Sequence, residues 1–351
     1  MSTKPVGGPS NRIRALQQKV DQLQSDVRLT NLRDAVEDVG STASGLVERV
    51  RSLRARGYVF EKSLEGKAAD LEGQWSPLRS RVLGQIDQEA AGLQRDLASV
   101  EQLVRQVGAP AGTPPAAPPL LGQAERAAEA LEGKAEAAER SIRGMYDQYQ
   151  GEVNQLMQHL RRVEWMLTQF AEATFRLLPT EGGIMAVRAT WQKGGKDDPT
   201  GILYLTDQRL LFEQKQEIAT KKMLFITTEK EKIQELLFEV PVGQIEKVQA
   251  SKKGLLRHED HLDLDLAAGG ALSSAHFHID GQRSKTWQGL IGSAMSGDFD
   301  RDRAVAVDQK AAEKVRTAPT RCPNCNAPIT QQILRGMDRI TCEYCGHVIR
   351  L

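Results

Sequence analysis

Four cysteines near the C-terminal end constrain this chain more than any other feature. They form two Cys-x-x-Cys pairs, Cys322–Cys325 and Cys342–Cys345, which are separated by sixteen residues. Each pair can present two thiolates to one tetrahedral ion, and this spacing is typical of a zinc ribbon. Because the last thirty residues hold few apolar side chains, they cannot bury a self-sufficient core, and we expect metal binding to supply the folding energy.

The ligand set predicts one structural Zn²⁺ over residues 320–351. Four thiolates leave no coordination position for water, which argues against a catalytic ion. Gly346 follows the second pair, where a positive φ is expected, and Asn326 occupies the matching position after the first. The intervening residues predict a hairpin in which Ile329–Leu334 returns as Ile340–Tyr344. A redox dithiol is disfavoured because the pairs lie outside any βαβ pattern.

Helical periodicity dominates the first half of the 351-residue chain, a length that suggests two or three domains. Apolar residues recur at steps of three and four from Ile13 to Leu64 and again from Leu121 to Phe170. Aromatic residues make up only 5%, which fits long helices better than one large core. We therefore expect coiled-coil helices over 11–107, with a restart near Ser76–Pro77, and one long helix over 120–177. Residues 1–10 are expected to be disordered.

The Pro/Ala-rich stretch 108–119 is predicted to be an extended linker between these helical segments. An apolar stripe of this length must pack against something. Its partner is either the other helical segment of the same chain or a second copy, and the pattern leaves both open. Self-association through the helices is therefore one of the expected interactions.

The periodicity changes from about 3.5 to 2 after residue 177, which indicates a β-rich domain over 178–292. Residues Leu262, Leu264 and Leu266 alternate with Asp263 and Asp265. Such alternation is typical of a sheet with one buried face. A polar linker over 293–319 would then lead to the ribbon. The predicted fold class is multidomain α+β.

The β-rich segment resembles the GRAM domain, a member of the pleckstrin-homology-like superfamily. The resemblance is carried by Glu181-Gly182, the hairpin Gly201–Phe212 with its turn Thr206–Arg209, Val240-Pro241-Val242, Phe277 and Trp287. It implies a bent antiparallel β-barrel or sandwich closed by a C-terminal helix, which binds lipid head groups or proteins without catalysis. The family has no universal ligand residues to carry over. The charged stretch Glu213–Glu235 is longer than a minimal domain needs.

Two basic segments are candidates for a ligand surface. The first is a turn that could insert into an anionic bilayer interface, and it comprises Lys252, Lys253, Leu255, Leu256 and Arg257. A purely structural role is favoured, in which the two leucines begin a strand and the lysines protect its edge. The second is a Gly-flanked pair, Lys193 and Lys196, whose field Asp197 and Asp198 largely cancel.

Four histidines gather in the same domain, at 258, 261, 276 and 278. A second metal site is disfavoured, because strand alternation places His276 and His278 on the solvent face together with Asp263. Cross-strand Asp–His pairs explain this clustering more simply.

Several classes of function are disfavoured by what the sequence lacks. There is no apolar run long enough for a membrane span and no N-terminal signal pattern. All four cysteines are assigned to the ribbon, so we expect a reducing, cytoplasmic location, at most peripheral at the inner face of the membrane. Nucleotide-binding loops, HExxH and GxSxG motifs are missing, and we expect no enzyme activity.

The sequence therefore predicts a non-enzymatic scaffold or adaptor. It would self-associate through its helices and bind a membrane surface or a protein through the GRAM-like domain, with the ribbon as a second contact surface. One alternative is a nucleic-acid-associated protein that reads its target with the locally basic ribbon. Another is a regulatory subunit of an enzyme complex.

Overall fold

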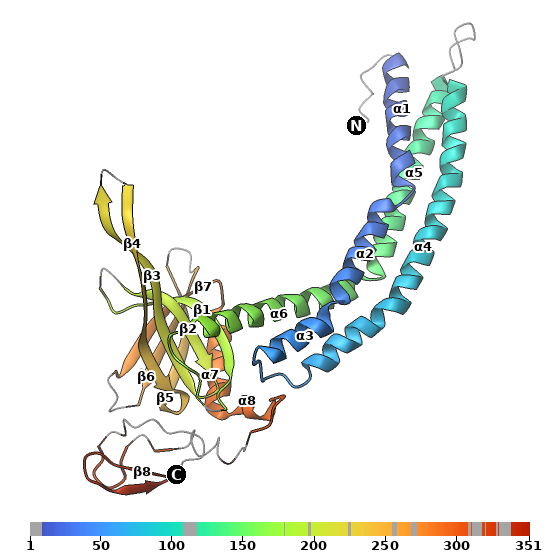
Figure 1. Cartoon of the computed structure of the whole chain (residues 1–351). Helices are drawn as coiled ribbons and strands as arrows, with labels where there is room; N and C mark the ends of the chain where they lie inside the picture. The colour runs from blue at the N-terminus through green and yellow to red at the C-terminus, as the bar shows by residue number, and fades with distance from the viewer. Residues whose placement is uncertain are drawn as a thin grey trace. The chain divides into compact units, whose positions relative to one another are not determined.

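The structure is a computed structural model that describes residues 9–107, 118–178, 180–195, 198–223, 226–254, 258–267, 272–307, 310, 318–319, 321–327, 329 and 338–351 (Figure 1). The chain divides into two compact units. The helical unit comprises Met1–Glu48 and Gly66–Gln158, and the sheet unit comprises Arg49–Glu65 and His159–Leu351. The combination of helices with an antiparallel sheet confirms the predicted α+β fold class.

The helices follow the predicted apolar stripe. They are α1 (Pro9–Asp26), α2 (Thr30–Ala43), α3 (Leu46–Ala55), α4 (Leu64–Val107), α5 (Pro118–Gly144) and α6 (Asp147–Glu172). Within the helical unit α1 lies beside α5 and forms the ion pairs Arg12–Glu125 and Lys19–Glu132 (Figure 1). The stripe therefore finds a partner within the same chain, while association between copies stays a prediction.

Two predicted helix boundaries were wrong. Helix α4 runs through Pro77 instead of restarting at Ser76. Pro77 and Gly73 are both exposed, so the Gly73 carbonyl that loses its i+4 donor faces water, and the buried face stays continuous. The single helix expected over 120–177 is two helices, because helical structure is interrupted between Gly144 and Asp147. There the phase of the stripe shifts by one residue, which leaves Met145 38% exposed and Tyr146 buried.

Seven antiparallel strands form the sheet, in the order β4-β3-β2-β1-β7-β6-β5. Their bounds are β1 Gly183–Trp191, β2 Thr200–Thr206, β3 Arg209–Met223, β4 Ile226–Pro241, β5 Ile245–Lys253, β6 Glu259–Leu266 and β7 Ser274–Asp280. A short 3₁₀ turn (η1, Val242–Gln244) joins β4 to β5, and helix α7 (Ser284–Ser296) packs on β5 and β6. Aromatic rings fill the core, with centroids of Trp191 and Phe238 5.6 Å apart and of Phe212 and Phe277 5.5 Å apart.

The sheet is open, which corrects the expected β-barrel. Strands β4 and β5 form its two edges, and no pairing joins them in the described part of the chain. Helix α7 packs against β5 and buries Trp287 and Ile291, so a helix, and not a further strand pairing, covers this part of the sheet. The long stretch Glu213–Glu235 adds no strand. It extends the β3–β4 hairpin, and the turn Thr206–Arg209 is the tight connection between β2 and β3 that was predicted.

The first residues of the segment expected to be a linker over 293–319 belong to the folded sheet unit. Helix α7 continues to Ser296 and is followed by α8 (Asp298–Arg301). Residues 302–304 then pair with residues 58–62, which we call the strap. The Ala304 N–H donates to the Val59 carbonyl at 2.8 Å, and the Lys62 N–H donates to the Asp302 carbonyl at 3.1 Å. The strap lies in a stretch whose 3–4 spacing had predicted helix.

Candidate metal centre

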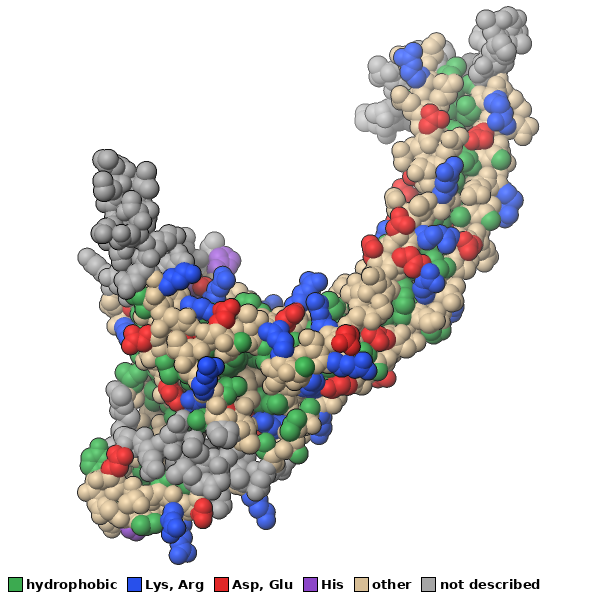
Figure 2. All heavy atoms as spheres, viewed as in Figure 1, with side chains coloured by type: hydrophobic (Ala, Val, Ile, Leu, Met, Phe, Trp, Pro, Cys, Tyr) green, Lys and Arg blue, Asp and Glu red, His purple; other side chains and the backbone are tan. Residues whose placement is uncertain are grey.

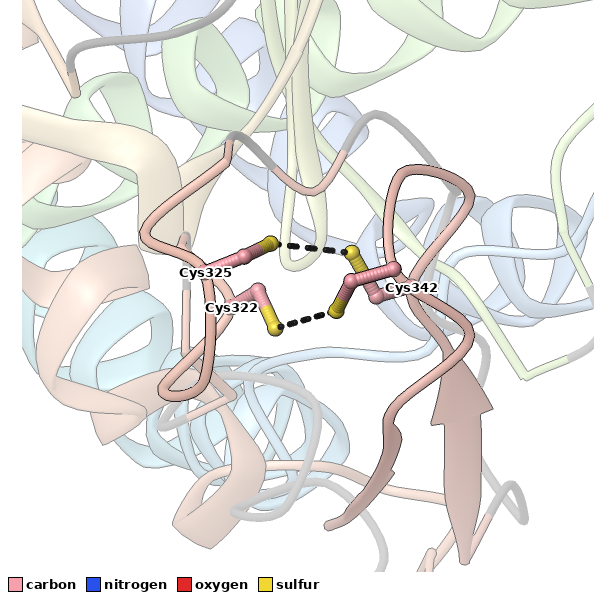
Figure 3. Close-up of side chains that lie close together, drawn as sticks. Cys322, Cys325 and Cys342 are labelled. Atoms are coloured by element: carbon pink, nitrogen blue, oxygen red, sulfur yellow. Dashed lines mark hydrogen bonds between the residues drawn. The ribbon is translucent and has the colours of Figure 1, made fainter.

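The four cysteines converge on one point at the C-terminal end of the chain (Figure 3). The Cys322 and Cys345 sulfurs are 3.7 Å apart, as are those of Cys325 and Cys342, and all four lie within 4.8 Å of one another. Four thiolates at about 2.3 Å from a tetrahedral ion would be separated by about 3.8 Å. A disulfide needs a separation of about 2 Å, so the arrangement fits a metal ion and all four cysteines are free.

Each Cys-x-x-Cys pair lies in a matching backbone knuckle. The Asn326 N–H donates to the Cys322 carbonyl at 2.9 Å, and the Gly346 N–H donates to the Cys342 carbonyl at 2.9 Å. Asn326 has φ 58° and Gly346 has φ 72°, as the sequence predicted. The left-handed backbone lets each knuckle turn sharply enough to aim both sulfurs to one side.

A miniature core supports the knuckles. Cys322 and Cys342 are buried together with Ile329, Ile340 and Ile349. Strand β8 (Arg339–Thr341) pairs with β9 (Val348–Arg350), and Ile340 lies opposite Ile349. Of the predicted hairpin partner Ile329–Leu334, only Ile329 lies among the described residues. The five buried apolar or thiol side chains among the described residues are too few to hold a fold alone, so a bound ion would supply much of the stability of this module.

The two exposed cysteines have different proton affinities. The His347 backbone N–H lowers the pKa of Cys345 to about 6, and the Asn324 side-chain amide, which donates to its sulfur at 3.6 Å, acts in the same direction. Although the Ala327 N–H lowers the pKa of Cys325, the neighbouring cysteine thiols, led by Cys345, raise it to about 12. The Cys345 thiolate is therefore readily available at neutral pH, and a metal ion that binds there would displace the proton from Cys325.

The basic residues predicted as a ligand surface have structural partners where the structure describes them. The Lys252 ammonium lies 2.7 Å from Asp260, and the same carboxylate accepts the Ser284 N–H at 2.8 Å at the start of α7. Burial raises the pKa of Asp260, but the hydrogen bonds from Lys252 and Ser284 outweigh it and lower the pKa overall. Lys253 lies 3.4 Å from a His276 ring nitrogen.

Lys193 lies over the Trp191 ring, 3.8 Å from its centroid. The other predicted members of the two surfaces, Leu255, Leu256, Arg257 and Lys196, lie outside the described residues.

One cross-strand Asp–His pair forms as predicted, and a further histidine lies beside it. His276 bonds to Asp263, its partner across the β6–β7 ladder. His261 lies on the same face but is only 2% exposed, and its Nδ1 is 3.0 Å from the Nε2 of His276. Burial lowers the pKa of His261 below its ordinary value of 6.5. The cysteines form the one group among the described residues whose donor atoms converge on a common metal position.

A buried ionic network at the turn of the β2–β3 hairpin was not predicted from the sequence. Arg209 donates to Glu181 at 2.6 Å, and both side chains are almost fully buried. Arg303 donates to Asp207 at 2.6 Å, with 3% of each side chain exposed. Three of these residues lie in the motifs that carry the GRAM resemblance, and the network explains why charged residues stand there. The fourth, Arg303, had been assigned to a linker.

Comparison with known proteins gives distant matches only. No family model matches the chain, and no curated protein matches it. Among solved structures, the linker-DH/PH domains of p115-RhoGEF share 11% identity, cover 82% of this chain and 98% of their own, and give a TM-score of 0.22. The DH/PH domains of PDZ-RhoGEF in complex with activated RhoA share 12% identity, cover 82% and 94%, and give 0.25. At these values the similarity carries no conclusion about function.

No helix in the described part of the chain is long and apolar enough to cross a membrane.

Proposed function

We propose that this chain is a non-enzymatic scaffold or adaptor whose C-terminal ribbon is folded by one structural Zn²⁺ and contacts a protein partner. The observation that carries the proposal is the convergence of Cys322, Cys325, Cys342 and Cys345, whose sulfurs all lie within 4.8 Å of one another. A tetrahedral set of four thiolates suits zinc or iron and leaves no site for substrate or water. Such a centre stabilises a surface and performs no reaction.

The surface that the ion would stabilise has exposed apolar side chains. Tyr344, in the second knuckle, is 66% exposed, and Val348, at the start of β9, is 50% exposed. In a module with so small a core, large apolar groups left in water are typical of a contact surface. The proposed contact therefore depends on the ion, since the knuckle that carries Tyr344 is held by it.

A protein partner is favoured over an anionic membrane. The ammonium charge of Lys252 is compensated by Asp260, and the Lys193 ammonium is held over the Trp191 ring. On the face shown in Figure 2, Lys and Arg side chains are interspersed with Asp and Glu along the helices. Mixed charge of this kind gives little net attraction to anionic lipid.

One observation favours a nucleic-acid contact as a second candidate. Arg339 and Arg350 lie directly opposite each other on β8 and β9, and both are exposed. Like charges opposed across strands destabilise a ladder, and an anionic partner would relieve that repulsion. Binding of a single-stranded oligonucleotide that falls steeply with salt, and that is lost in Arg339→Gln/Arg350→Gln, would establish this alternative.

The proposal is tested by metal analysis and partner capture on the full chain, purified under reducing conditions with zinc supplied. We expect one zinc per chain by mass spectrometry of the native protein. We also expect Tyr344→Ser/Val348→Ser to keep the zinc and lose a partner that the parent recovers, whereas Glu343→Gln keeps both. A chain without bound metal, or one whose ribbon stays ordered after chelation, would remove the basis of the proposal.

A further inference from the structure

A cavity of about 440 Å³ lies within the sheet unit, away from the cysteines. It is bounded by the strap, α6, the start of β1 and the segment from Gly281 to α8. Its apolar wall is formed by Phe60, Val163, Met166, Ile184, Leu290 and Phe299. The volume falls in the range of small-molecule sites, about 300–1,000 Å³. Because the wall combines buried and half-buried side chains, apolar surface remains available to an occupant.

One end of the cavity is polar and fixed in position. The Tyr58 hydroxyl donates to the Glu61 carboxylate at 2.8 Å, and the His159 Nε2 lies 2.9 Å from its other oxygen. Glu61 itself has φ 57°, a left-handed conformation that costs energy for a residue with a side chain and that is concentrated at functional sites. The Arg54 guanidinium holds it there by donating to the carbonyls of Tyr58 and Glu61 at 2.9 and 2.8 Å.

Two arginines give the cavity an excess of positive charge. Arg162 comes from α6 and Arg283 precedes α7, and both line the cavity and are exposed. Neither has an ion-pair partner among the residues that the structure describes. Glu61 contributes the single carboxylate of the lining and is already bound by Tyr58 and His159. Two guanidiniums beside an apolar wall therefore fit a ligand with one anionic group and an apolar body.

We infer that this cavity binds a free amphipathic carboxylate, such as a medium-chain fatty acid. The apolar chain packs on Ile184, Leu290 and Phe299, and the carboxylate accepts hydrogen bonds from Arg162 and Arg283. This site is independent of the metal centre and adds small-molecule binding to a chain proposed as a scaffold. A membrane phospholipid is a different occupant, and the experiment separates the two.

The test uses the full chain with dansylaminoundecanoic acid as the fluorescent probe, displaced by dodecanoate, by dodecanol, or by anionic phosphatidylserine vesicles. We expect saturable binding that dodecanoate displaces at least tenfold more effectively than dodecanol, because only the carboxylate engages the arginines. Charge-assisted hydrogen bonds of this kind change affinity by about tenfold each. Each of Arg162→Gln and Arg283→Gln should therefore weaken binding about tenfold.

Matched controls come from the neighbouring residues. Arg161→Gln and Lys285→Gln remove exposed cations that do not line the cavity, and both should leave the affinity unchanged. Leu290→Trp fills the cavity and should abolish binding, with circular dichroism to show that it folds. No saturable binding by the parent, equal displacement by dodecanol, equal loss in the control variants, or displacement by vesicles alone would overturn the inference.

Discussion

The buried ion pair between Asp207 and Arg303 gives the sharpest test of how the sheet unit is held together. Each side chain is 3% exposed, and the Arg303 Nη1 lies 2.6 Å from the Asp207 Oδ2. The other carboxylate oxygen accepts the Gly182 N–H at 2.8 Å, and the Arg303 Nη2 donates to the Thr180 carbonyl at 2.9 Å. Both charged side chains lie inside the fold, so no solvent molecule can replace a lost partner unless water enters.

Arg303→Met would remove the guanidinium that faces the buried Asp207 carboxylate. Removing one member of a buried pair costs about 3–5 kcal/mol, because the remaining charge loses its compensation. Asp207→Asn/Arg303→Met replaces both charges by groups of similar size, and the free energy of unfolding should recover to within about 1–2 kcal/mol of the parent. Arg301→Met is the control. Arg301 is 68% exposed and paired with Asp298 at the surface, so its loss should cost under about 0.5 kcal/mol.

Urea unfolding followed by tryptophan fluorescence measures these differences. A Trp75→Phe background confines the signal to the sheet unit, which holds the other three of the four tryptophans. If Arg303→Met costs no more than Arg301→Met, the segment after α7 is not part of the folded core. If the double variant is as unstable as Arg303→Met alone, the cost does not come from an unpaired charge.

Three further outcomes follow from the same structure. Cys345→Ser removes one of four thiolates, so we expect bound zinc to fall well below one per chain, and full occupancy measured by elemental analysis would contradict a four-thiolate centre. Burial lowers the pKa of His261 in the folded state, so the unfolded chain binds more protons below about pH 6.5. The sheet unit should therefore lose stability as the pH falls through that range. In urea midpoints measured from pH 7.5 to 5, His261→Phe should depend less on pH than the parent. Gly40→Ala places a Cβ 2.3 Å from Trp75 and should lower the melting temperature of the helical unit. The Cβ of Gly84→Ala meets no atom within 4 Å, so this variant should stabilise the helical unit by up to about 1 kcal/mol. A higher melting temperature in both variants would refute the close approach of Gly40 to Trp75.

Apolar spacing predicted which side chains of the helices are buried more accurately than it predicted the backbone. Leu16, Leu23 and Val36 are all buried where the stripe placed them. The same 3–4 spacing continues through Phe60 to Leu64, yet Gly57 has φ 95° and Glu61 has φ 57°, and the strap between them is not helical. The spacing of apolar residues indicates which positions are buried and does not fix the backbone conformation. A non-helical strap that buries Tyr58 and Phe60 is therefore equally compatible with this spacing.

The four-cysteine cluster could be predicted from the sequence because its geometry is local. Each knuckle is made within five residues, from two cysteines and one residue that tolerates positive φ. Charged residues whose partners are distant were not accessible in this way. Asp207 was expected at a turn, and nothing near it in the sequence indicated a partner 96 residues away. Lys252 was a candidate for lipid binding until Asp260 was found beside it.

The two proposed binding sites depend on different sources of stability, which bears on how a scaffold could use them. Among its described residues the proposed ribbon buries five side chains together, so under the proposed function its surface exists only as long as the cysteines are reduced and metal is bound. The cavity is built on the sheet unit, whose core contains the ring cluster of Trp191, Phe212, Phe238 and Phe277 and whose strap is tied down by Arg54. Under these two proposals, loss of zinc should therefore remove the ribbon contact and leave the carboxylate site intact, so the two interactions should respond separately.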